Sequence, residues 1–276
     1  MKTRAPHAIL AIDCSQRRSH LVVARGATDF ARVFARSFES LDQRDREPFW
    51  DELRALFAEA QVTAADITAI AVANGPGGFT GLRVATSFAK GFALARNTPI
   101  IAVPSAVLFA ASDAARGGTG PWLVALAAKG ETAWCTVVSR TNDGAALVMS
   151  EPRVVDGAEF SVLAAQINAS QIDAAKIDAV KSDAVKSLAR HGSSEQATGV
   201  LLADEHLGPS LAECAANAGL ATRALEVDSH AFAREAARRL DAGETIDALM
   251  LAPIYAREPE AVTKWRERAV SARRNA

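Results

Sequence analysis

The feature that most constrains the fold is a glycine-rich turn that separates a strand pattern from a helix pattern. Residues Ile67–Ala73 (ITAIAVA) form a short apolar run that is typical of a buried strand. The turn NGPGGFTG follows, and a helical pattern runs from about Gly81 to Ala95, with Thr80 placed to cap it. The sequence therefore predicts a strand–turn–helix unit, a building block of α/β folds.

The turn itself is a candidate site. Its glycines let a second backbone approach closely and leave N–H groups exposed at a helix start, where anions bind. It has neither the Gly-Lys-Ser/Thr ending of a P-loop nor the spacing of a dinucleotide fingerprint, so a purely structural turn is the alternative. The residues of this motif loop are Gly75, Pro76, Gly77, Gly78, Phe79, Thr80, Gly81 and Arg83.

A second candidate site follows the first apolar run, Ala8–Asp13 (AILAID), which also has the pattern of a buried strand. Asp13, Cys14 and Ser15 resemble the opening of the phosphate loop in actin-like ATPases and sugar kinases, where an acid and a hydroxyl end the first strand. Those enzymes add a glycine that lets the backbone wrap the phosphates, whereas three bulky residues, QRR, follow here. We expect these residues to lie near any bound nucleotide, with a plain strand-ending turn as the alternative.

The two halves of the chain share a layout in which strand patterns precede helix patterns. The best boundary between them is RGGTGP at Arg116–Pro121, where glycines and a proline separate two apolar segments. We therefore expect two related α/β lobes, over residues 1–116 and 117–276. Helical patterns fall at residues 48–60, 81–95, 105–115, 207–218 and 231–242.

A charged stretch in the second half, Gln171–Ala189, fits neither pattern. Each of its repeated Asp residues precedes a Lys by three positions, and the unit recurs every five residues, a period of neither a helix nor a strand. Alternating charges of this kind usually form a solvated surface. We interpret the stretch as an insertion in the second lobe.

Composition and charge exclude several classes of protein. The chain has 276 residues, of which 49% are hydrophobic and 23% charged, values of a globular rather than a disordered protein. A formal net charge of -1 argues against binding nucleic acid through the overall field, without excluding a local basic patch. No apolar run approaches the ~20 residues of a membrane span, so no membrane partner is expected.

The cysteines and histidines support neither a disulfide framework nor a metal site. Cys14, Cys135 and Cys214 form no CxxC pair, which favours a reducing cytoplasm. The histidines form no HxxxH or HExxH pattern, and no GxSxG elbow is present, so we predict no metal, no cofactor and no catalytic residue. The carboxylates left open for acid–base work are Asp13, Glu131, Asp204 and Asp228.

Four motifs together resemble the TsaB (YeaZ) family in their order and spacing. They are AILAIDCS, IAVANGPGGFTGLR, AKGFALA and PIIAVPS, at Ala8–Ser15, Ile70–Arg83, Ala89–Ala95 and Pro99–Ser105. Two later segments, KGETAW and PIYAR, resemble further family motifs. The chain departs from the family where Gly78 replaces the usual serine, and where AAK at 127–129 stands in place of Asp-Ala-Arg.

The resemblance implies a two-lobed, actin-like fold of the ASKHA, RNase H-like class, with mixed sheets flanked by helices. Members of the family act as non-catalytic partners in making N6-threonylcarbamoyladenosine at position 37 of tRNA. The resemblance thus implies a TsaD-like transferase and a TsaE-like ATPase as partners, a homodimer when the chain is alone, and only indirect contact with tRNA. The transferase carries an HxxxH metal motif, and its absence here fits the non-catalytic member.

The first two helical patterns carry more aromatic residues than a single buried stripe needs. Trp50 stands beside Phe49 on a neighbouring helix face, and a second apolar stripe recurs every four residues from Val84. In the resembled family these helices bundle with the transferase or with a second copy. We expect an interface, with packing inside the lobe as the alternative, at Phe49, Trp50, Leu53, Phe57, Val84, Phe88 and Phe92.

Two other functions stay open on sequence grounds. An ATP-dependent small-molecule kinase of the actin-like superfamily would need a complete phosphate loop and a catalytic acid, and the missing glycine after Asp13 counts against it. A metallopeptidase-like activity would need metal ligands, and no metal motif supports it.

Overall fold

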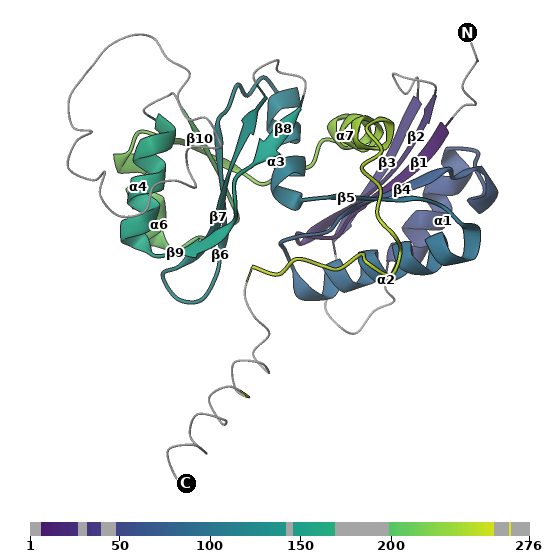
Figure 1. Cartoon of the computed structure of the whole chain (residues 1–276), viewed down its shortest axis with the longest axis horizontal. Helices are drawn as coiled ribbons and strands as arrows, with labels where there is room; N and C mark the ends of the chain where they lie inside the picture. The colour runs from purple at the N-terminus through teal and green to yellow at the C-terminus, as the bar shows by residue number, and fades with distance from the viewer. Residues whose placement is uncertain are drawn as a thin grey trace.

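The fold consists of two lobes, each built on one mixed β-sheet (Figure 1). The computed structural model describes residues 7–26, 32–39, 48–141, 146–168, 199–256 and 265. In the first sheet the strand order is β3-β2-β1-β4-β5. Its strands are β1 His7–Asp13, β2 Arg18–Gly26, β3 Arg32–Glu39, β4 Ala69–Ala73 and β5 Ile100–Val103.

The second sheet repeats the topology of the first. Its strand order is β11-β10-β6-β7-β8, with β9 paired to β7. Each sheet has a central strand, β1 or β6, that pairs antiparallel with the next strand and parallel with a later one. The predicted two-lobed α/β fold with mixed sheets is therefore confirmed. The strands are β6 Trp122–Ala127, β7 Ala133–Arg140, β8 Leu147–Met149, β9 Arg153–Val155, β10 Val200–Ala203 and β11 Ala221–Ala224.

Two helices cover one face of the first sheet, because each has an apolar stripe. Helix α1, Phe49–Glu59, leads through a short 3-10 turn (η1, Ala64–Asp66) into β4. Helix α2, Phe79–Arg96, buries mainly small residues, so its backbone lies close to the sheet. The buried residues of these helices are Phe49, Leu53, Leu56, Leu82, Ala85, Thr86, Ala89 and Ala93.

Helix α7, Ser229–Asp241, covers the opposite face of the first sheet. Its Phe232 and Ala236 are fully buried among strand residues such as Ile9 and Ile101. Asp228 caps the helix by accepting a hydrogen bond from the Ala231 N–H at 2.7 Å. Because both faces of this sheet are covered, its central strands are apolar throughout rather than alternating.

Three helices flank the second sheet. Helices α4, Gly157–Asn168, and α6, Pro209–Asn217, pack together on one face, and α3, Ser105–Ala115, covers the other. Helix α3 also contacts α7, so these two helices lie between the sheets and join the lobes (Figure 1). Within the described part of the chain, no helix is both long and apolar enough to cross a membrane.

After the second lobe the chain returns to the first. Residues 246–256, here called the strap, begin where the Ile246 N–H donates to the Ile100 carbonyl oxygen of β5 at 2.9 Å. Leu251 is fully buried in the core between the first sheet and helices α1 and α2. The Ile254 N–H then donates to the Asn74 carbonyl oxygen at 2.7 Å, beside the motif loop.

This return differs from the predicted division, which assigned all of 117–276 to the second lobe. Helix α7 and the strap pack on the first sheet, because their apolar residues fit a face and an edge that the N-terminal helices leave bare. The second sheet and its helices are built from residues between Ser105 and Ala224. The charged stretch Gln171–Ala189 lies outside the described residues.

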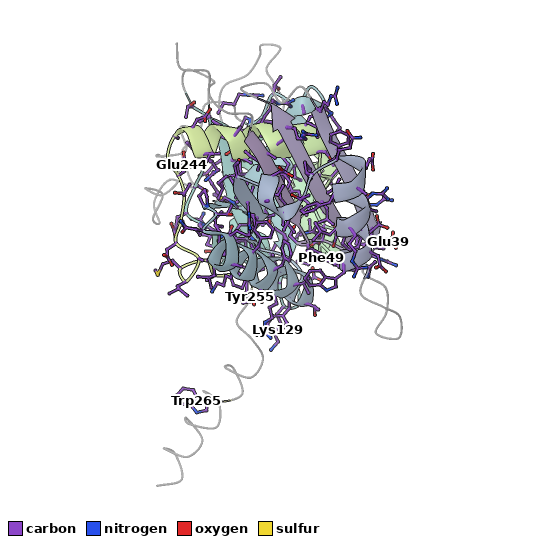
Figure 2. All side chains as sticks on the ribbon, turned by 90° about the vertical axis from the view of Figure 1, so that its right-hand side faces the viewer. Glu39, Phe49, Lys129, Glu244, Tyr255 and Trp265 are labelled. Carbon is purple, nitrogen blue, oxygen red and sulfur yellow. The ribbon has the colours of Figure 1, made fainter. Side chains whose placement is uncertain are left out.

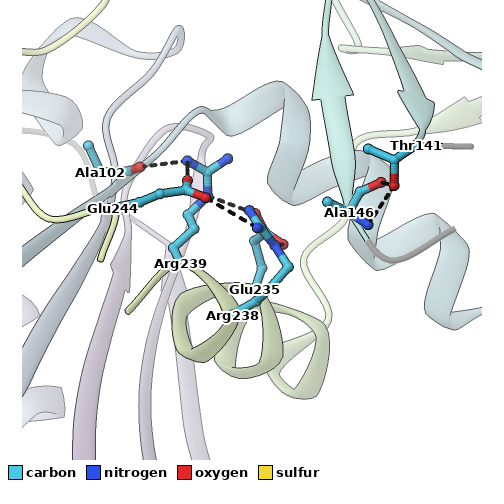
Figure 3. Close-up of polar contacts among 7 residues, drawn as sticks. All are labelled: Ala102, Thr141, Ala146, Glu235, Arg238, Arg239 and Glu244. Carbon is cyan, nitrogen blue, oxygen red and sulfur yellow. Dashed lines mark hydrogen bonds and ion pairs between the residues drawn. The ribbon is translucent and has the colours of Figure 1, made fainter. Parts of the chain in front are cut away.

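A cluster of charges holds the end of α7 against the segment that leads to the strap (Figure 3). Glu235 is only 6% exposed, and its carboxylate accepts hydrogen bonds from Arg238 and from Arg239 Nε, the latter at 2.7 Å. Glu244 accepts from the same two arginines at 3.2 and 3.0 Å. Since Arg239 Nη1 also donates to the Ala102 carbonyl oxygen, the cluster ties α7 to β5.

Candidate functional site

The two sites predicted from sequence meet at one place in the structure. The Gly78 N–H donates to the Ser15 carbonyl oxygen at 2.7 Å, which joins the motif loop to the end of β1. A Cβ atom at Gly77 would overlap the same carbonyl oxygen, and one at Gly81 would overlap the carbonyl oxygen of Cys14. These glycines are needed because two backbones touch there.

The motif loop is also held from its other side, by the strap. Gly75 has a φ of +110°, and a Cβ there would overlap the Ile254 carbonyl oxygen. Gly78 is different, since an added Cβ would lie 3.7 Å from the nearest atom. A serine, the residue usual in the resembled family, would therefore fit at this position. Gly78 is the N-cap of α2 and no side chain caps the helix, so the predicted Thr80 cap is wrong.

The end of β1 buries an ionisable side chain. Asp13 is fully buried, and its Oδ1 accepts a hydrogen bond from the Ser15 N–H at 2.9 Å. Burial raises the pKa of Asp13 from 3.8 to about 6, although hydrogen bonding from Ser15 opposes the rise. Directly opposite on β2 is His20, whose pKa burial and the charge of Arg18 lower to about 4.

More polar atoms are buried along the same edge of the sheet. Among the described residues, Asp13 Oδ2, Ser15 Oγ, Asn74 Oδ1 and Ser105 Oγ have no hydrogen-bond partner. They follow β1, β4 and β5, three neighbouring parallel strands, and carboxyl ends of parallel strands are where α/β folds bind ligands. The Ser15 and Gly78 N–H groups are both engaged within the protein, so neither is available to cradle a phosphate.

The corresponding edge of the second sheet contains a carboxylate that the motif comparison did not lead us to expect. Asp204, at the end of β10, accepts a hydrogen bond from the Ala127 N–H at 2.9 Å. It thus places a carboxylate beside Ala127, the last residue of β6. Nearby, Glu131 accepts a hydrogen bond from the Ser210 hydroxyl in α6, while Lys129 is exposed. In the sequence, Asp204 stands out only as a carboxylate that follows an apolar run. No local spacing indicates which backbone group it contacts.

The predicted interface residues form a gradient from core to surface. Phe49 and Leu53 are buried in the core of the first lobe, at 0% and 8% exposure. Trp50 is 50% exposed. The remaining four, which are partly buried against the same core, are Phe57, Val84, Phe88 and Phe92.

Contacts between aromatic rings link the buried residues of this set to the exposed ones. Phe49, labelled in Figure 2, contacts Trp50 and Phe88 with ring centroids 5.3 and 5.2 Å apart. Trp50 and Phe88 contact each other edge-on at 5.5 Å, and Phe92 lies 5.8 Å beyond Phe88. Helices α1 and α2 therefore share an aromatic surface, the α1–α2 face, made of Trp50, Phe88 and Phe92 over the buried Phe49.

A second aromatic group joins the motif loop to the strap. Phe79, at the start of α2, is 44% exposed and lies 5.2 Å from the ring of Tyr255. The Arg83 guanidinium lies 3.7 Å from the centre of the Phe79 ring, and Arg83 Nε donates to Tyr255 Oη at 3.3 Å. Sequence reasoning placed Phe79 and Arg83 in the motif loop but missed Tyr255, which is 172 positions away from Arg83.

In the portion that the structure describes, no three His, Cys, Asp or Glu side chains are grouped so that they could hold a metal ion.

Comparison with known proteins identifies relatives of the chain. Residues 46–197 match the family described as TsaD, tRNA N6-adenosine threonylcarbamoyltransferase, whereas no curated protein matches the chain. YeaZ from Pseudomonas aeruginosa superposes with a TM-score of 0.63 at 18% identity, over 90% of this chain and 100% of that one. An uncharacterized protein with similarity to peptidase YEAZ, from the same organism, has a TM-score of 0.62 at 18% identity, over 91% and 100%. These matches confirm the resemblance that the motifs predict. At 18% identity, the two solved structures show only that the fold is shared.

Proposed function

Because the chain belongs to the TsaD family of tRNA N6-adenosine threonylcarbamoyltransferases, we propose that it acts in the threonylcarbamoyladenosine modification of tRNA. Within that process its role is that of a non-catalytic subunit, which binds a TsaD-like transferase and activates it. The observation that carries this proposal is the α1–α2 face. A half-exposed tryptophan packed edge-on against Phe49 and Phe88 is a pre-ordered anchor of the kind that dominates protein–protein interfaces.

The chemistry of the motif loop supports a role without catalysis. The Ser15 and Gly78 N–H groups, which lie where the two candidate sites meet, are engaged by Asp13 and by the Ser15 carbonyl oxygen. The sequence has no pair of histidines four residues apart, whereas the TsaD transferase carries an HxxxH metal motif. In such a complex the transferase would catalyse the reaction, and this chain would bind and activate it.

The α1–α2 face also accounts for the other expected partners. Without the transferase, two copies of the chain would cover the same aromatic residues by forming a homodimer. A TsaE-like ATPase would then join the assembly of the chain with the transferase. The two kinds of assembly compete for one surface, so a single substitution should weaken both.

A substitution at the most exposed aromatic residue tests the interface. Trp50→Glu places a charge where half of the side chain already meets solvent, so the monomer should stay folded while co-purification with the transferase is lost. Val154→Glu is the matched control, because Val154 is equally 50% exposed but lies on β9 in the second lobe. Circular dichroism checks the fold of both variants. Retained co-purification of the folded Trp50→Glu variant would refute the interface assignment.

The modification itself provides a test in cells. Mass spectrometry of tRNA nucleosides should show threonylcarbamoyladenosine falling when the protein is depleted. The wild-type chain and Val154→Glu should restore it, and Trp50→Glu should not. An unchanged level of the modified nucleoside in the depleted strain would contradict the proposed function.

A further inference from the structure

Helix α2 carries basic residues and no acidic ones. Its 18 residues include Arg83, Lys90 and Arg96 but no Asp or Glu, although the whole chain has a formal net charge of -1. Arg96 lies in the last turn, where a positive charge stabilises the end of a helix. Arg83 and Lys90 are not at the helix end, and among the described residues neither of them forms an ion pair.

These two cations lie on one flank of α2, and the aromatic residues of the α1–α2 face lie on the other. Seven residues span about two helical turns, so Arg83 and Lys90 share a side of the helix. This side lies next to the strap, because Arg83 donates a hydrogen bond to Tyr255. Phe88 lies on the side of α1, where it contacts Trp50. A helix lying along α2 would therefore meet aromatic rings on one side and two positive charges on the other.

The surface of α2 between these flanks is open. Ser87 and Gly91 are exposed, and a Cβ atom added at Gly91 would meet no atom within 4 Å. A glycine in the middle of a helix weakens that helix, and close approach of a second backbone is a common reason for one. Leu94, one turn beyond Lys90, is 63% exposed. The outward side of α2 thus has room for a partner that is itself partly apolar.

The acidic residues of the neighbouring helix are already paired within the chain. All three acids of α1 form ion pairs: Asp51 pairs with Arg54 at 2.8 Å, and Glu52 and Glu59 pair with Arg36 at 3.1 and 3.2 Å. They are therefore not available to neutralise the cations of α2. The charge left uncompensated beside the α1–α2 face is positive.

We propose that Arg83 and Lys90 select the partner of the α1–α2 face, favouring an amphipathic helix with acidic residues on the transferase over a second copy of this chain. The proposal deepens the function proposed above, because it rests on the binding of a transferase there. An acidic helix would pair with both cations while its apolar side covers the aromatic residues. A second copy would bring another basic α2 to the same surface, and like charges that face each other across an interface weaken it.

The test follows two assemblies of the purified full-length chain. In the variant R83Q/K90Q, affinity for the TsaD-like transferase, measured by calorimetry at low ionic strength, should fall roughly tenfold, as expected for two lost surface ion pairs. The homodimer of the same variant, measured by analytical ultracentrifugation, should become tighter. In 1 M KCl, where the Debye length is about 3 Å, the variant and wild type should bind the transferase almost equally.

Two further variants serve as controls, and circular dichroism checks that all of them fold. R153Q/R234Q removes two exposed charges from β9 and α7 and should change neither assembly. R83K/K90R keeps both charges and should bind the transferase nearly as tightly as wild type, which separates the effect of charge from the stacking of Arg83 on Phe79.

Several outcomes would overturn the proposal. They are transferase binding by R83Q/K90Q that equals that of wild type, a homodimer no tighter than that of wild type, or equal losses in R83Q/K90Q and R153Q/R234Q. These results are independent of the Trp50→Glu experiment, so the charge selection can fail while the interface with the transferase stands. Failure of the wild-type chain to bind the transferase would instead refute the proposed function, and the charge selection with it.

Discussion

At the scale of single residues, the sequence of the motif loop is constrained by close contacts between neighbouring backbone segments. The glycine pattern predicted a close approach, and Gly77 and Gly81 indeed lie against the carbonyl oxygens of Ser15 and Cys14. Which carbonyl each glycine meets depends on the packing of β1 beside β4, and no local pattern encodes that. For the same reason the sequence could not pair Asp204 with Ala127, or Tyr255 with Arg83.

Two glycines of one helix should respond to alanine in opposite ways. Gly81→Ala forces a Cβ into the Cys14 backbone and should lower the free energy of unfolding by about 1–3 kcal/mol. Gly91→Ala has open space around the new Cβ and should raise it by about 0.5–1 kcal/mol, because alanine favours the helix. Urea denaturation of both variants measures the difference, and a destabilised Gly91→Ala would contradict this account.

The opposed pair Asp13 and His20 should shape how stability depends on pH. The pKa of Asp13 is higher in the folded chain, so its contribution is present below pH 3.8 and is lost as pH rises toward 6. The pKa of His20 is lower in the folded chain, so its contribution is present above pH 6.5 and is lost as pH falls toward 4. The two contributions run in opposite directions over the same window and largely cancel in the wild-type chain.

Substituting one residue of the pair should reveal how the other residue makes the free energy of unfolding depend on pH. Asp13→Asn should stabilise the fold at pH 7.5 by about 3 kcal/mol, the equivalent of a pKa rise of about two units, and should lose stability below pH 6.5. His20→Asn should do the reverse and lose stability as pH rises from 4 to 6. Urea midpoints at pH 4.5, 6 and 7.5 give the profiles. Identical profiles for Asp13→Asn and wild type would rule out an ionised, buried Asp13.

At the scale of elements, the sequence predicts those that carry a strong apolar period. The expected helices at 48–60 and 81–95 correspond to α1 and α2, because their stripes face a sheet. Strand β11 has the sequence ATRA with all four residues exposed, so it has no apolar pattern and forms only by pairing with β10. Tertiary pairing, rather than local preference, determines such a strand.

The charge cluster on α7 should be important for the stability of that element. Glu235→Ala would leave Arg239, whose side chain is 14% exposed, without its closest partner, and should cost about 3 kcal/mol. Arg17→Ala is the control, because its 3.8 Å pair with Glu39 is solvent-exposed and should contribute less than about 1 kcal/mol. Hydrogen exchange of the strap amides should rise in Glu235→Ala alone. An unchanged exchange rate would show that the cluster does not hold the strap.

At the scale of the whole molecule, two lobes could be predicted from the glycine-rich break, but the path of the chain could not. The first sheet is completed by α7 and the strap, whose apolar residues resemble those of any amphipathic segment. Which surface α7 and the strap pack against depends on which sheet face the other helices leave uncovered. That is a property of the assembled lobe and not of the local sequence. Helix α3 already packs on the second sheet before the predicted boundary at residue 117, and the first lobe is complete only with α7 and the strap.

Two leucines of the strap should separate its anchoring residues from its surface. Leu251→Ala empties a fully buried position in the first lobe and should lower the free energy of unfolding by about 2–5 kcal/mol. Leu249→Ala removes a side chain that is 73% exposed and should change it by less than about 0.5 kcal/mol. Thermal denaturation measures both. Equal melting temperatures would show that the strap contributes nothing to the first lobe.

The strap has a consequence for how the protein is made. During synthesis the strands of the first sheet leave the ribosome early, but one face and one edge stay uncovered until residues 229–256 have been translated. The second sheet, drawn from a continuous stretch, has its partners sooner. We therefore expect the nascent N-terminal lobe to be the later of the two to become protease-resistant, reversing the order in which the lobes are encoded.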